Sequence, residues 1–303
     1  TSDYEDYNFH KKILKSLYFK NGFFLYLFFS LLKCKCIIMT LTDLGNHIAK
    51  SKSCYKYIYF FHSLSSTFKR YTKEAFINYD IILTNGQYQK DEILEIEQIY
   101  KFPKKEIINM GYFYLDNILK KAKLNSADAN KVLFAPSWNY NKKNLLEDRG
   151  LDIINILLKN KFSIILRPHP EHYKRSLKTI NKIEEYYKNN NNFKIDTNSS
   201  NLDSLEKSQI LITDNSAIDM EFGLIFERPI IYIEYSDKIH NEDYLRVKSK
   251  NIDDEFKNSV GNKLDIDNLN NLPNFINTII NNNSEKKAYI SKFKAKYITN
   301  LNN

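Results

Sequence analysis

The sequence has 303 residues and a net charge of +9, and 43% of its residues are hydrophobic and 27% charged. This composition excludes an intrinsically disordered chain, and the length suffices for two domains of about 150 residues, each with its own core. The positive charge attracts nucleotide phosphates, anionic lipids or nucleic acid without choosing among them.

The chain begins TSDYEDYNFH, without a methionine and without the segments of a secretory signal. We therefore expect a cytoplasmic protein. Whether its true start lies upstream stays open; if it does, the first domain lacks its first strand. Three cysteines, Cys34, Cys36 and Cys54, form no CxxC pair and have no matching histidine spacing. They predict reduced thiols and no zinc site.

A short apolar segment, GFFLYLFFSLL, occupies residues 22–32, with Lys20 before it and Lys33 and Lys35 after it. A transmembrane helix needs about 20 apolar residues, so this segment is too short to span a bilayer. Two interpretations stay open. One is a helix buried in the core, and the other is an interfacial helix on the inner face of the cell membrane, with its lysines at anionic lipid.

Short apolar runs alternate with longer periodic segments along most of the chain, which is typical of βαβ units around a parallel sheet. In the first half the predicted strands are 36–40, 55–61, 79–84 and 106–110, with helices near 43–50, 68–76 and 87–100. In the second half the predicted strands are 131–136, 162–167, 193–196, 209–213 and 229–235, each followed by a helical segment.

The polar segment 120–131 has no periodic apolar face and is interpreted as a linker between domains. We therefore predict an α/β fold with two Rossmann-like domains, residues 1–125 and 126–303, the second carrying C-terminal helices. Their parallel sheets should face a central cleft. Ligands of such sheets bind beyond the carboxyl ends of the strands, so motifs directly after strands are the candidates for a site.

One such motif is LRPHP, residues 166–170. Pro168 and Pro170 restrict the backbone on both sides of His169 and hold it at the strand end. Arg167 offers a planar guanidinium suited to phosphate oxygens. The alternative is a histidine that only hydrogen-bonds a neighbouring loop.

A second motif, TDNSAIDMEF, follows the strand at 209–213. Asp214 or Asn215 can cap a helix that starts near Ser216. The free N–H groups of that helix, with the Ser216 hydroxyl, would bind an anion, and Glu221 could accept hydrogen bonds from ribose hydroxyls. An ordinary capped helix is the alternative.

Two further strand ends carry candidates. His62 lies in YFFHSLSSTFKRY, residues 59–71, and an unperturbed imidazole is suited to take a proton from a hydroxyl at physiological pH. A core histidine is the alternative. Ser137 and Trp138, in VLFAPSW, could touch the phosphates or base of a nucleotide, or line the hinge; the alternative is a surface loop.

Taken in order, FHS, ILTNG, GYFYLD, LFAPSW, LRPHP and TDNSAIDMEF followed by RPIIYIE resemble the CDP-glycerol glycerophosphotransferase family over most of residues 36–235. The resemblance implies a GT-B fold and a role in teichoic-acid-like or capsular glycerol-phosphate polymers. It implies that His62 is the general base on the acceptor hydroxyl and that His169 contacts the donor pyrophosphate.

The resemblance also implies donor phosphate binding at the helix start, Asn215, Ser216 and Ala217, and a ribose contact at Glu221. Two departures concern the acceptor and the polyol. Phe61-His62-Ser63-Leu64 stands where family polymerases usually carry Trp-His-Gly-Thr, and Ala217 replaces a second serine.

The resulting hypothesis is a transferase that moves glycerol phosphate, or a related polyol phosphate, from a CDP-linked donor to a hydroxyl of a lipid-linked or growing surface glycan, releasing CMP. It would need no metal or further cofactor and would bind no nucleic acid. One alternative is a GT-B glycosyltransferase or nucleotide-sugar epimerase of surface polysaccharide synthesis. The other is a non-catalytic protein that binds membranes or nucleic acid.

Overall fold

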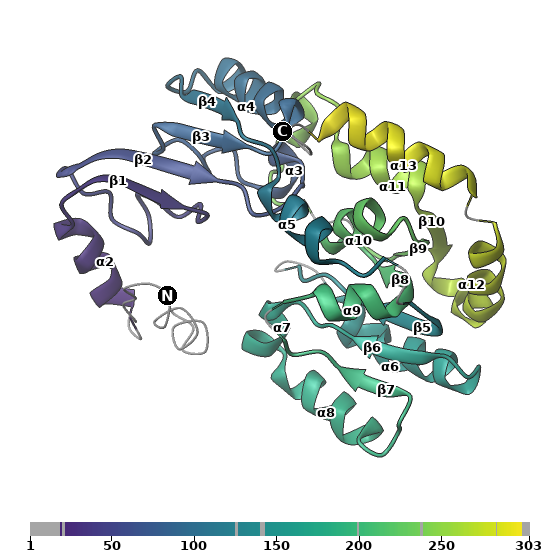
Figure 1. The fold of residues 1–303 in the computed structure, drawn as a ribbon. Helices are drawn as coiled ribbons and strands as arrows, with labels where there is room; N and C mark the ends of the chain where they lie inside the picture. Colours follow the sequence, from purple (N-terminus) through teal and green to yellow (C-terminus); the bar gives the residue numbers. More distant parts are fainter. Residues whose placement is uncertain are drawn as a thin grey trace.

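Two parallel sheets organise the computed structural model, which describes residues 19, 22–124, 127–139, 143–198, 200–236, 239–282 and 284–298 (Figure 1). The first sheet has the order β1-β2-β3-β4 and the second the order β10-β9-β8-β5-β6-β7. The strands are β1 (Cys34–Met39), β2 (Cys54–Phe60), β3 (Ile81–Thr84), β4 (Glu106–Asn109), β5 (Asp128–Phe134), β6 (Ser163–Leu166), β7 (Phe193–Ile195), β8 (Ser208–Thr213), β9 (Ile230–Glu234) and β10 (Asn262–Asp265). The predicted boundary between domains at residue 125 stays a prediction.

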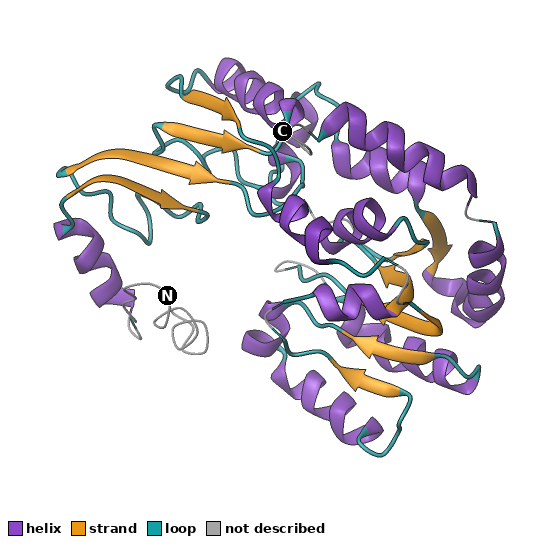
Figure 2. Ribbon diagram, in the orientation of Figure 1, coloured by secondary structure: helices purple, strands orange, loops and turns teal. Residues whose placement is uncertain are grey.

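Helices connect the strands and surround the second sheet (Figure 2). They are α2 (Gly22–Leu31), α3 (Thr67–Arg70), α4 (Gln87–Tyr100), α5 (Phe113–Lys121), α6 (Leu145–Lys159), α7 (Pro170–Arg175), α8 (Leu177–Tyr187), α9 (Leu202–Lys207), α10 (Ile218–Phe226), α11 (Ile252–Val260), α12 (Leu272–Asn281) and α13 (Ser284–Tyr297), with 3₁₀ turns at Tyr244–Arg246 and Ile266–Asn271.

The central strands of the second sheet are apolar on both faces. Val132, Ile210 and Ile231 are fully buried on one side of β5, β8 and β9, and Leu211 and Ile230 on the other. Parallel strands covered by helices on both faces are expected to read as continuous apolar runs. This explains why these strands were predictable from sequence.

The buried cluster that contains Leu211 and Ile230 also joins the two halves of the chain. Leu64, Tyr88 and Tyr112 of the first half pack in one cluster with residues of α10, α11 and α13. The C-terminal helix α13 returns to the first half, where Tyr297 meets Tyr88 with ring centroids 6.1 Å apart (Figure 1). The two halves are therefore held together by apolar packing as well as by chain connection.

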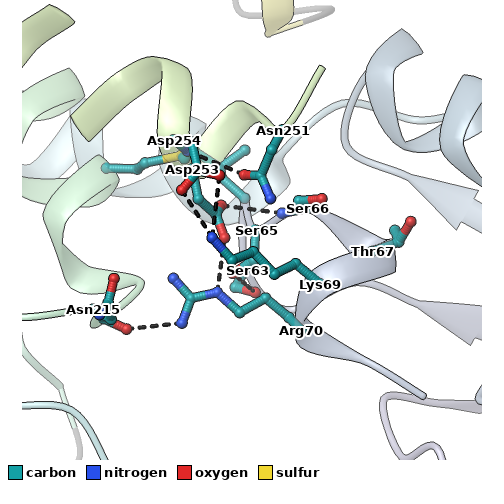
Figure 3. A network of polar contacts seen from close by, with 12 residues as sticks. Ser63, Ser65, Ser66, Thr67, Lys69, Arg70, Asn215, Asn251, Asp253 and Asp254 are labelled. Atoms are coloured by element: carbon teal, nitrogen blue, oxygen red, sulfur yellow. Dashed lines mark hydrogen bonds and ion pairs between the residues drawn. The ribbon is translucent and has the colours of Figure 1, made fainter. Parts of the chain in front are cut away.

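Polar contacts also join α3 to the second half (Figure 3). Arg70 Nε lies 2.7 Å from Asp253 Oδ2, and Arg70 Nη1 donates to the Asn215 carbonyl at 2.8 Å. Lys69 pairs with Asp254 at 3.1 Å. The start of α3 is held from the other side by fully buried Glu92, which accepts the Thr67 N–H at 2.6 Å and whose pKa burial raises to about 8. These bonds fix the segment that follows His62.

Every predicted strand overlaps an observed one, but three other predictions need correction. Residues 43–50 form a turn closed by a bridge between Leu44 and Ile48, because Gly45 adopts φ +90°. The helix predicted at 68–76 is only the four-residue α3, since the chain turns to extended backbone at Tyr71, whose ring packs on Phe61 and Phe76. Strand β10 was not predicted.

The third correction concerns α2. None of its ten residues, all of which the structure describes, is buried. Phe23 is 67% exposed and Leu31 69%. The interpretation of this segment as a buried helix is therefore wrong, while Lys20 lies outside the described residues. No helix in the described part of the chain has the length and apolarity needed to cross a bilayer.

Candidate active site

A cavity of about 630 Å³ lies between the two halves. Its lining comprises Thr42, Asp43, Asn46, His62, Ser63, Ser65, Arg70, Tyr71 and Thr72 from the first half and His169, Asn201, Ser216, Ala217, Ile218, Glu221 and His240 from the second. This volume is in the range of small-molecule sites. Both predicted histidines thus open onto one cavity.

His62 follows β2 and presents an exposed ring to the cavity. The protein on either side of the cavity nevertheless shields the ring from bulk water, and this desolvation lowers the pKa of His62 below its usual 6.5. The ring is therefore neutral at pH 7 and able to accept a proton. Its backbone is held by Tyr112, whose hydroxyl lies 3.2 Å from the His62 carbonyl oxygen.

His169 is the N-cap residue of α7, with Pro170 at the first helical position. Its Nδ1 accepts the backbone N–H of Glu171 at 3.2 Å. A neutral imidazole whose Nδ1 accepts a hydrogen bond carries its proton on Nε2. The local backbone therefore selects the tautomer that can donate to a phosphate oxygen in the cavity.

The start of α10 differs from the prediction. The helix begins at Ile218 with Ala217 as N-cap, and none of the described side chains caps it. Asp214 instead accepts the backbone N–H and the hydroxyl of Ser137 at 2.7 and 2.8 Å, and Asn215 donates to the Ser236 carbonyl. Capping by Asp214 or Asn215 was therefore wrong. Within the first turn, the Asp219 N–H donates to the Ser216 carbonyl at 3.2 Å and the Met220 N–H donates to Asp219 Oδ1 at 2.6 Å. The Ile218 N–H, beside the Ser216 hydroxyl, is left for an anion.

Five predicted residues, all of them described, lie outside the cavity lining: Ser137, Trp138, Arg167, Asp214 and Asn215. Arg167 pairs with Asp196 at 2.6 Å. Trp138 is 7% exposed and packs edge-on against His172, with ring centroids 4.9 Å apart. These residues support the loops behind the cavity, and their direct contact with a donor stays a prediction.

Glu221 lines the cavity but is bonded to the protein through both oxygens. Tyr112 Oη lies 3.0 Å from Oε1, and Asn201 Nδ2 donates to Oε2 at 2.7 Å. Burial raises the pKa of Glu221. Tyr114 in turn donates to Asn201 at 2.8 Å. A ribose hydroxyl at Glu221 would join or replace one of these donors.

The sequence reasoning missed several residues that line the cavity or hydrogen-bond to its lining. Tyr112 and Tyr114 lie in GYFYLD, a motif used only for its order in the chain, and Asn201 follows a polar segment without a motif. Arg70 carried no role, and Asp43 and Asn46 were placed on a helix. Among the described residues, no group of three His, Cys, Asp or Glu side chains could hold a metal ion. The absence of metal and further cofactors stays a prediction.

A sequence profile of the family described as CDP-Glycerol:Poly(glycerophosphate) glycerophosphotransferase matches residues 41–301. The chain belongs to this family. The resemblance inferred from the motifs is confirmed, and so is the class of enzyme. The match favours the transferase over the alternative of a non-catalytic binding protein.

Solved structures of the wall teichoic acid polymerase TagF resemble this protein. A histidine-to-alanine variant is 18% identical and aligns over 89% of this chain and 69% of its own, with a TM-score of 0.53. A histidine-to-asparagine variant soaked with CDPG is 18% identical and aligns over 89% of this chain and 68% of its own, with a TM-score of 0.53. TagF itself is 18% identical and aligns over 83% of this chain and 65% of its own, with a TM-score of 0.50. This likeness confirms the GT-B-like fold. No curated protein matches the chain.

Proposed function

We propose that the protein, in this cavity, transfers glycerol phosphate from CDP-glycerol to a hydroxyl of a lipid-linked or growing surface glycan and releases CMP. The observation that carries this proposal is that His62, His169 and the uncapped start of α10 line one cavity. The family description supports the donor. TagF, which this chain resembles in fold, has been soaked with CDPG.

On the acceptor side, neutral His62 accepts the proton of the attacking hydroxyl as the new oxygen–phosphorus bond forms. The attack falls on the phosphorus that carries glycerol. A base poised near neutral pH is suited to this step because it is unprotonated yet basic enough to take the proton. The lowered pKa of His62 keeps the ring in that form.

On the donor side, the bond between the two phosphates breaks and negative charge develops on the departing CMP. His169 donates from Nε2, while the Ile218 N–H at the start of α10 and the Ser216 hydroxyl donate beside it. Fixed donors of this kind stabilise developing charge without reorganising during the reaction. Positioning and electrostatics therefore carry the transfer, as in phosphoryl transfer generally.

Product analysis tests this function. The purified protein is incubated with CDP-glycerol labelled in the glycerol and with a lipid-linked glycan acceptor, and CMP and labelled acceptor are quantified. We expect the two products in equal amounts. Transfer of a sugar with release of a nucleotide, or interconversion of a nucleotide sugar without CMP release, would instead identify a glycosyltransferase or an epimerase.

We also propose that α2 lies in the interface of the inner leaflet of the cell membrane, next to a lipid-linked acceptor. The helix is apolar around its whole circumference, and such helices need apolar surroundings. Its exposed residues include Phe23, Phe24 and Leu31, and exposed Lys33 and Lys35 follow it. Lysines beside an apolar helix meet anionic headgroups while the rings enter the acyl boundary.

A further inference from the structure

Residues 42–46 form a loop between β1 and β2. Buried side chains and backbone hydrogen bonds hold this loop on the core of the first half. Leu44 and Ile48 are 2% and 3% exposed and pack in the core of the first half. The Gly45 N–H donates to the Ile48 carbonyl at 2.7 Å, and the Asn46 N–H donates to the Asp43 carbonyl at 3.0 Å. Backbone bonds and two buried side chains therefore fix the loop.

Side chains from a distant segment also hold the backbone of this loop. Asn78 Nδ2 donates to the Leu44 carbonyl at 2.6 Å, and the Tyr79 hydroxyl donates to the Leu41 carbonyl. Gly45, at φ +90°, lies so close that a Cβ there would stand 2.3 Å from Asn78 Nδ2. Only glycine fits both the backbone conformation and this approach. The loop therefore holds its shape without help from the side chains of Asp43 and Asn46.

These two side chains are exposed and line the cavity on the same half as His62. The groups proposed for the donor phosphates, in contrast, come from the second half. The cation of the first half in the lining, Arg70, is paired with Asp253 and the Asn215 carbonyl. Asp43 thus adds a carboxylate to the half of the lining that carries His62.

A carboxylate in this position selects the chemistry of its ligand. It repels phosphate, but its two oxygens accept hydrogen bonds from two neighbouring hydroxyls, and a bond to a charged acceptor is stronger than one between neutral groups. The Asn46 amide can donate and accept at the same time. Together they fit adjacent hydroxyl groups of a neutral molecule.

We propose that Asp43 and Asn46 form the subsite for the acceptor's reactive end, a neutral vicinal diol of a polyol or sugar. The inference rests on the proposed function and deepens it. One hydroxyl of the diol is placed at His62 while its neighbour is held by Asp43, so the loop sets which hydroxyl attacks. An acceptor whose reactive end carries a phosphate beside the hydroxyl is disfavoured.

The test uses three small acceptors with the full chain and CDP-glycerol: glycerol, 1,3-propanediol and glycerol 3-phosphate. We expect Asp43→Asn to raise the KM for glycerol by about tenfold or more, the loss of a hydrogen bond to a charged group. The KM for 1,3-propanediol should change little, and that for glycerol 3-phosphate should fall. Asn46→Ala should raise the KM for glycerol but should not lower the KM for glycerol 3-phosphate.

Asp91→Asn, an exposed carboxylate on α4 outside the cavity lining, is the matched control and should leave all three constants unchanged. CMP affinity, measured by thermal shift, should be the same in all variants. If wild-type protein transfers glycerol phosphate but Asp43→Asn alters the three acceptors equally or not at all, the subsite is refuted and the function stands. If wild-type protein releases no CMP with these three acceptors or with the lipid-linked glycan acceptor, both proposals fall.

Discussion

The two walls of the cavity are built differently. The second-half wall holds its functional groups in set orientations, since the His169 ring is held by the Glu171 N–H and the Ile218 N–H is a backbone group of α10. On the first-half wall, His62, Asp43 and Asn46 are exposed, and the hydrogen bonds that hold them are made through the backbone. On the second-half wall the donor atoms themselves are held in place, whereas on the first-half wall the backbone is held and the side chains can rotate.

This difference matches what each wall has to do in the proposed reaction. The donor diphosphate is the same group in every reaction cycle, so rigid, preorganised hydrogen-bond donors stabilise its developing charge best. An acceptor end differs from one surface glycan to the next, and side chains free to rotate can follow it. The comparison leads us to expect that second-half changes affect donor binding together with rate, and first-half changes affect acceptor use.

The largest effect is expected at His62. His62→Ala should lower kcat by about 10²- to 10⁴-fold because it removes the general base. CMP affinity should be unchanged, since the donor contacts lie on the other wall. His47→Ala is the control, because His47 is exposed in the same half but outside the cavity lining. A variant that keeps transfer within a few-fold of wild type would remove His62 from the mechanism.

The pH dependence sharpens this assignment. A base works only when unprotonated, so kcat/KM for the acceptor should fall as pH drops through the pKa of His62. Desolvation places that pKa below 6.5, and the midpoint of the decline should therefore lie below pH 6.5. An acid limb centred above 6.5 would contradict the environment described for the ring.

His169 should give the next largest effect, about 10²- to 10³-fold in kcat on change to alanine, the range for one charge-stabilising donor. Two further variants separate its possible roles. A glutamine amide reaches the position of Nε2 and should restore part of the rate, whereas asparagine, a good N-cap for α7, should not. Rescue by asparagine alone would mean that His169 only caps the helix.

Arg70 tests how the two walls are held relative to each other. Arg70→Met leaves Asp253 without its cation at a site where both side chains are nearly buried, 13% and 12% exposed. The free energy of unfolding in urea should fall by about 3 kcal/mol. Arg149→Met breaks a pair whose side chains are 42% and 55% exposed and should cost less than about 1 kcal/mol. Equal losses would show that the Arg70 contact does not clamp the walls.

The same comparison explains what could be predicted from sequence. Buried parallel strands are continuous apolar runs, so all but β10, a four-residue edge strand reading NKLD, were found. Strand ends then pointed to His62, His169, Ser216 and Glu221, which do line one cavity. These are local signals, in which a residue's neighbours in the chain define its place.

Two of the errors share one cause, which is a partner far away in the sequence. Residues 43–50 form a turn in which Gly45 lies against Asn78 and the Leu44 carbonyl accepts from Asn78 Nδ2, so they do not form the predicted helix. Asp214 accepts a hydrogen bond from Ser137, which lies 77 residues earlier, and therefore does not cap α10. Such pairings decide whether a polar side chain faces a ligand or the protein, and no local pattern encodes them.

The smallest effect on catalysis is expected at α2, which lies apart from the cavity lining. Phe23→Ser combined with Phe24→Ser should leave turnover of a soluble acceptor unchanged. Binding to phosphatidylglycerol vesicles should weaken about tenfold or more, because each buried phenyl ring contributes about 1.5–3 kcal/mol. Tyr186→Ser, an equally exposed aromatic residue on α8 of the second half, should not weaken it. If both variants bind vesicles like wild type, α2 does not enter the membrane, and acceptor selection rests with the first-half wall of the cavity alone.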